Sequence, residues 1–75
     1  DWQQARDLFR REAARQAYNP EVHFWLAQAS WRLGDLRDAD RHLELARQNS
    51  TTPQDHALYA AKLGWLRAQR VRVFN

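Results

Sequence analysis

The histidines are the first side chains to consider for chemistry. His23, His42 and His56 fall in three different predicted helices, and none has a second histidine or a carboxylate at position i+4. A pattern such as His-Glu-x-x-His, which places two metal ligands on one helix face, is therefore missing. The chain also has no cysteine. We expect no metal site, and we place the histidines at the surface or between helices.

Carboxylates crowd one end of a predicted helix at Asp35, Asp38, Asp40 and Glu44. The first two occupy positions at which they cap the helix, and the others have arginines within one turn. Ser30 and Ser50 have no base nearby in the sequence, and two glycines are too few for a phosphate-binding loop. We therefore predict no catalytic residues, no cofactor and no enzymatic activity.

The basic residues are eleven arginines and one lysine, which give a net charge of +3 and a pI near 10.2. Binding to nucleic acid or another polyanion is one interpretation, because basic side chains repeat along two helix faces. Nine acidic residues are interleaved with them, and several arginines complement a helix C-terminus. We rank this interpretation last. It would use Arg6, Arg10, Arg11 and Arg15 on one face and Arg67, Arg70 and Arg72 on the other.

Composition limits the kind of protein that carries these residues. At 75 residues the chain is one small unit, and 44% apolar with 28% charged residues is typical of a folded domain. No apolar run is long enough to cross a membrane, so we expect no membrane insertion. The sequence leaves the cellular compartment open, since a chain without cysteine is compatible with an oxidising or a reducing one.

Capping residues and helical spacing of apolar residues predict an all-α domain of four helices, over residues 1–17, 20–33, 35–48 and 53–70. Asp1, Asn19, Asp35 and Thr52 are the expected N-caps. Gly34 supplies the left-handed residue of a short turn, which makes its two flanking helices antiparallel neighbours. We expect the basic tail over residues 70–75 to fray.

The chain repeats itself with a period of 34 residues. The shift superposes capping and apolar positions of the first and third helices, and aromatic and small positions of the second and fourth. The matched pairs are Asp1 with Asp35, Trp2 with Leu36, Ala5 with Ala39, Phe9 with Leu43, Phe24 with Leu58, Trp25 with Tyr59, Ala27 with Ala61 and Trp31 with Trp65.

This period and its residues resemble the tetratricopeptide repeat (TPR) family. The positions that match its pattern are Leu26-Ala27, Gly34-Asp35-Leu36, Ala39, Leu43 and Ala46. His23 and Ser30 stand where the family has large aromatic residues, and Ala68 stands where a second turn glycine would fall. The resemblance implies about one and a half degenerate repeats plus a capping helix. It also implies stacked antiparallel hairpins, a fragment of a right-handed superhelix, in one domain over residues 1–75 that belongs to a longer chain.

The resemblance implies a protein-protein interaction module with a groove for a peptide or a partner helix. Carried over by position, the groove residues are Phe24, Gln28, Trp31, Arg32, Leu58, Lys62 and Trp65, with Leu66 beside them. Trp and Arg are frequent binding hot spots, and Arg32 with Lys62 favours an acidic peptide. An alternative is that Trp31 and Trp65 only pack between helices.

A structural role is the second interpretation. The first helix corresponds to the second helix of a repeat whose first helix is absent from this sequence. Trp2, Leu8 or Phe9 would then lack cover unless more chain or a second copy supplied it. Stacking in a larger scaffold or self-association would provide that cover.

Overall fold

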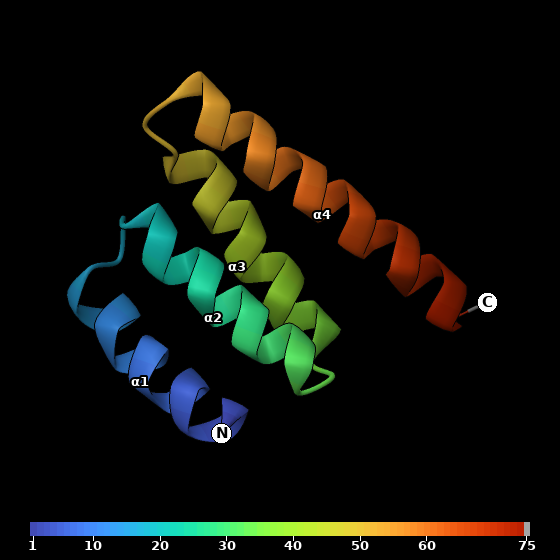
Figure 1. Ribbon diagram of the computed structural model, residues 1–75, viewed down its shortest axis with the longest axis horizontal. Helices are drawn as coiled ribbons and strands as arrows, with labels where there is room; N and C mark the ends of the chain where they lie inside the picture. Colours follow the sequence, from blue (N-terminus) through green and yellow to red (C-terminus); the bar gives the residue numbers. More distant parts are fainter. Residues whose placement is uncertain (75) are drawn as a thin grey trace.

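The computed structural model describes residues 1–74, with side chains as far as Val71, and this part of the chain forms four α-helices. They are α1 (Trp2–Arg15), α2 (Pro20–Arg32), α3 (Leu36–Asn49) and α4 (Pro53–Phe74). Each helix lies antiparallel beside the one before it, so that α1 and α4 form opposite edges of the molecule (Figure 1). The prediction of an all-α fold is confirmed.

The residues that begin each helix do so by capping free backbone amides. Asp1 accepts hydrogen bonds from the amides of Gln3 and Gln4, and Asn19 accepts one from Glu21. In the same way Asp35 caps Asp38 at 3.2 Å and Thr52 caps Asp55 at 3.1 Å. Gly34, between α2 and α3, has φ +81°, a conformation that glycine adopts without a Cβ clash. These local signals are sufficient to set the helix starts.

The sequence predicted that the last helix ends near residue 70. Helix α4 instead continues to Phe74. No proline or glycine interrupts the chain after Gly64, and Arg70 Nη1 holds Asp40 Oδ2 of α3 at 2.9 Å. The expected fraying concerns residues 70–75. Of these, Asn75 and the side chains of residues 72–74 lie outside the described part of the chain.

The core lies where α2, α3 and α4 meet. Small residues at Ala27 and Ala39 let the helices approach closely, and Leu43, Leu63 and Leu66 fill the space around them. Helix α1 contributes no buried residue, and Ala5, Phe9 and Ala13 are its half-buried apolar residues. The molecule is therefore a three-helix core with α1 laid against one edge. Within the described residues, every helix is too short or too polar to cross a bilayer.

Candidate binding groove

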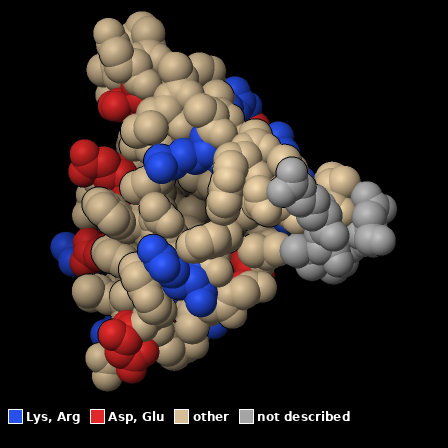
Figure 2. Space-filling model, turned by 45° about the vertical axis from the view of Figure 1, so that its right-hand side comes forward, with Lys and Arg blue, Asp and Glu red and all other residues tan. Residues whose placement is uncertain are grey.

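A pocket of about 90 Å³ opens between α2 and α4, above α3. Buried apolar residues of α3 and α4 form its base, and aromatic rings with two polar side chains form its rim. Figure 2 shows a hollow in this side of the molecule with Lys and Arg side chains on two sides of it. We call the pocket and its rim the groove. Its lining residues are Phe24, Ala27, Gln28, Trp31, Ala39, Leu43, Lys62, Trp65 and Leu66.

At one end the rim of the groove continues into a ladder of aromatic rings and a cation that lies beside the pocket. The rings of Trp31 and Trp65 meet edge to face with centroids 5.6 Å apart. The guanidinium carbon of Arg32 lies 5.2 Å from the centroid of Trp31 and 5.4 Å from that of Trp2. Trp65 and Trp2 are about half exposed, at 53% and 45%. The ladder therefore connects α4, α2 and α1 at the surface.

The other end is formed by Phe24 and Lys62. The ammonium nitrogen of Lys62 lies 5.6 Å from the ring centroid of Phe24, which itself packs against the buried Tyr59 at 5.6 Å. Leu58 lies outside the pocket, in a shallower depression that it shares with Lys62 and Trp65. A cation on an aromatic ring thus stands at each end of the groove.

The structure brings most of the predicted groove residues together. Phe24, Gln28, Trp31, Lys62, Trp65 and Leu66 all line the one pocket. Leu66 is only 2% exposed and forms part of the base. Arg32 does not line the pocket, since its guanidinium turns toward Trp2. Peptide binding by these residues remains a prediction.

The two cations of the groove differ from most other basic residues in having no acidic partner. Among the side chains that the structure describes, no ion pair includes Arg32 or Lys62. The arginines paired with carboxylates are Arg6, Arg10, Arg15, Arg41, Arg47, Arg67 and Arg70. Most of the positive charge is therefore neutralised locally, whereas the charges of Arg32 and Lys62 are not.

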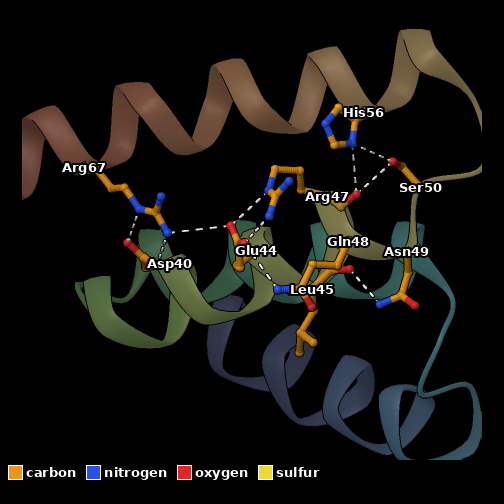
Figure 3. A network of polar contacts seen from close by, with 9 residues as sticks. All are labelled: Asp40, Glu44, Leu45, Arg47, Gln48, Asn49, Ser50, His56 and Arg67. Atoms are coloured by element: carbon orange, nitrogen blue, oxygen red, sulfur yellow. Dashed lines mark hydrogen bonds and ion pairs between the residues drawn. The ribbon is translucent and has the colours of Figure 1, made fainter.

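The largest group of paired arginines joins α3 to α4 on another side of the molecule, which we call the seam (Figure 3). Asp40 accepts hydrogen bonds from Arg67 at 3.1 and 3.2 Å and from Arg70 at 2.9 Å. Glu44 pairs with Arg47 and lies 3.6 Å from Arg67. Burial opposes ionisation of Asp40, but these arginines outweigh it and hold the pKa of its carboxyl below the usual range. Both acids are thus fixed as carboxylates.

A second polar cluster is enclosed between α2 and α3. Nε2 of His23 donates to the carbonyl of Ala17 at 2.6 Å, so a neutral His23 accepts at Nδ1. Nδ1 of His42, 3.0 Å away, is then the donor, and Arg41 lies 3.3 Å from the remaining nitrogen. Burial lowers the pKa of His42 to about 4, against the opposing charge of Asp38. His42 is therefore neutral at pH 7, and the contact between the two rings joins α2 to α3.

Sequence reasoning placed these histidines at the surface or between helices but did not pair them. Ser30, at 0% exposed, likewise donates to Asp38 at 2.6 Å, a contact that sequence reasoning missed. The hairpin offered a signal for both contacts, because antiparallel helices bring together residues equally distant from their turn. Gly34 lies about midway between the members of each pair. The described residues contain no group of three or more histidine, cysteine or acidic side chains able to hold a metal ion.

The basic faces proposed for nucleic acid are largely neutralised. Arg6 lies 3.5 Å from Asp35 and Arg10 lies 3.9 Å from Asp38, while Arg15 pairs with Glu12 within α1. Arg67 and Arg70 belong to the seam, and the side chain of Arg72 is outside the described part. Helix α1 therefore presents no continuous stripe of unpaired arginines for a phosphate backbone.

Trp2 is the groove-side residue that sequence reasoning assigned elsewhere. It was grouped with Leu8 and Phe9 as an uncovered apolar residue, yet its ring holds Arg32. The same hairpin rule applies, because the start of α1 must lie beside the end of α2.

No family model, no curated protein and no solved structure matches this chain.

Proposed function

We propose that the groove binds an acidic peptide segment of a partner protein. The observation that carries this proposal is the position of the unpaired cations. Lys62 lines an apolar pocket and Arg32 lies beside it over the ring of Trp31. The arginines of the seam and most of those of α1 have carboxylate partners, and Arg11 and Arg37, the other described basic residues without an ion pair, do not line the pocket. An acidic ligand complements both features at once.

The groove supports such binding without a conformational change. Its base is made of buried Leu43 and Leu66, and its aromatic rim is held by ring contacts between helices. A pocket of about 90 Å³ suits one small aliphatic side chain, while a carboxylate nearby reaches a cation of the rim. Because the receptor is already ordered, the entropy lost on binding is mainly that of the peptide. The resemblance to the TPR family points to the same surface.

A random library of 12-residue displayed peptides tests this function. We expect selected peptides to combine an aspartate or glutamate with an aliphatic residue, and Trp65→Ala to weaken their binding about tenfold or more. Trp25→Ala is the matched control, because Trp25 is also half exposed, at 50%, but does not line the pocket. Equal losses in the two variants, or no selected peptide, would contradict the proposal.

Assembly into a larger scaffold is the second candidate, and the exposed side of α4 favours it. His23 and Ser30 of α2 are buried against α3, but Ala57 and Gly64, found 34 positions later on α4, are exposed. The face that α3 covers on α2 is thus open on α4. Sedimentation over a range of concentrations tests this role. Ala60 is exposed on α4 between Ala57 and Gly64, on the same face. A dimer that Ala60→Glu abolishes supports assembly, and a monomer at all concentrations contradicts self-association.

A further inference from the structure

The guanidinium of Arg32 is held by two tryptophans from different helices. Trp31 precedes it in α2, and Trp2 approaches from the start of α1, with ring centroids 5.2 and 5.4 Å from the guanidinium carbon. Trp2 makes this contact while 45% of its surface stays exposed. The position of Arg32 therefore depends on α1, a helix that contributes nothing to the buried core.

Stacking on rings leaves the hydrogen-bonding capacity of an arginine free. The guanidinium carbon lies over both indole rings, and a guanidinium stacked in this way keeps its five N–H donors, which lie along its edge. A carboxylate pairs with that edge through two parallel hydrogen bonds. No carboxylate of the described residues pairs with Arg32 in this way. Arg32 is thus held by two rings, and its N–H groups pair with no carboxylate of the described residues.

Holding the side chain in advance matters for binding. A free arginine side chain loses rotamer freedom when it pairs with a ligand, and prior stacking on Trp2 and Trp31 removes part of that loss. Lys62 rests on a single ring, that of Phe24, at 5.6 Å. Of the two groove cations, Arg32 is therefore the one whose geometry selects a planar anion.

We propose that Trp2 positions Arg32 as a receptor for a side-chain carboxylate of the bound peptide, so that α1 forms part of the binding surface. This inference rests on the proposed function of the groove. The surface then runs along the ladder from Trp65 through Trp31 and Arg32 to Trp2, across three helices. A peptide that places an aliphatic side chain in the pocket sets an aspartate or glutamate against Arg32.

The test compares acidic peptides with their amides. The tightest peptide from the library is made with a C-terminal amide, and each aspartate or glutamate in turn is replaced by asparagine or glutamine. Titration of the wild-type chain should show one position at which the amide binds about tenfold more weakly. Arg32→Gln should reduce this acid-to-amide ratio to less than about twofold. Arg37→Gln, at an exposed arginine of α3, should leave the ratio unchanged.

Trp2 is tested by the same ratio, which a purely structural role would not change. Trp2→Leu should lower the ratio about threefold or more, and Trp2→Phe should restore most of it because a ring remains under the guanidinium. Circular dichroism melts of each variant verify that it is folded.

Any of four results would overturn the inference. If Arg32→Gln keeps the full ratio while Trp65→Ala still weakens binding, the carboxylate lies elsewhere and the groove function stands. If Trp2→Leu behaves as wild type, Trp2 does not position Arg32. If the peptide binds only with a free C-terminus, the anion is the chain end and not a side chain. Failure to select any peptide defeats the function and this inference together.

Discussion

The seam and the groove both contain basic residues of α4, but these residues have different roles in the two regions. Arg67 and Arg70 of α4 reach Asp40 of α3 and are fixed there, while Lys62 of α4 faces the pocket and rests on a ring. In the seam each cation has a carboxylate, so its charge contributes to packing. In the groove the cations have aromatic neighbours, which hold them without neutralising them. The local partner of a basic residue, and not the net charge of +3, indicates where a ligand can bind.

Leu66→Ala should have the largest effect, because Leu66 belongs to the core that supports both regions. Leu66 is 2% exposed and belongs at once to the core and to the pocket. We expect a loss of about 2–5 kcal/mol in the free energy of unfolding, measured by urea denaturation. Trp65→Ala, one residue earlier on the exposed rim, is the control and should lose much less. Equal losses would contradict our assignment of core and rim.

The pH dependence of stability should distinguish the contribution of the buried histidines from that of the seam. His42 is neutral in the fold, with a pKa of about 4 against 6.5 when unfolded, so the unfolded chain binds more protons in between. Stability should therefore fall by about 1–3 kcal/mol as the pH is lowered from 6.5 to 4. The seam carboxylates Asp40 and Glu44 have lowered pKa values, so they stabilise the fold at any pH above their ordinary pKa values of 3.8 and 4.5. Their contribution to stability is lost only when the pH falls below those values.

Urea unfolding at several pH values measures this dependence. His42→Gln should remove most of the slope between pH 6.5 and 4, and His56→Gln, at the exposed histidine, should keep it. An unchanged slope in His42→Gln would show that the paired histidines do not control it.

Asp40→Asn tests the seam by releasing two arginines together. We expect about 1 kcal/mol of destabilisation at low salt, because the pairs are only partly shielded from water. The difference from wild type should shrink as salt is added, while peptide affinity at the groove stays the same. A loss of peptide binding in this variant would mean that seam and groove are not independent.

Lys62→Ala is the groove counterpart and should affect stability least. Lys62 has no carboxylate partner among the described side chains, so we expect a change within about 0.5 kcal/mol. Affinity for a selected acidic peptide should fall about threefold to tenfold, measured by titration calorimetry. Arg67→Ala should show the reverse, with lower stability and unchanged affinity. The same pattern in both variants would remove the distinction between the two regions.

Much of this architecture follows from local sequence signals. Asp1, Asn19, Asp35 and Thr52 cap the helices where expected, and Gly34 turns the chain, because caps and turns depend on neighbouring residues only. The repeat of 34 residues also led us to predict a groove shared by residues of α2 and α4, and most of these residues line one pocket.

Contacts that depend on the angle and rotation between helices were not predicted. The stacking of Trp2 on Arg32 and the pairing of His23 with His42 require two helix surfaces to meet in one register. The neutralisation of Arg67 by Asp40 likewise joins residues of two helices. The amino-acid composition gives the number of charged residues but does not indicate which of them form ion pairs.

The indole N–H signals of the four tryptophans test the central claim most directly, in an NMR titration with the tightest selected peptide. We predict shifts at Trp2, Trp31 and Trp65, which form the ladder with Arg32, and little change at Trp25, which is exposed but outside the groove. A largest shift at Trp25, or a peptide that binds without moving the ladder signals, would contradict this claim.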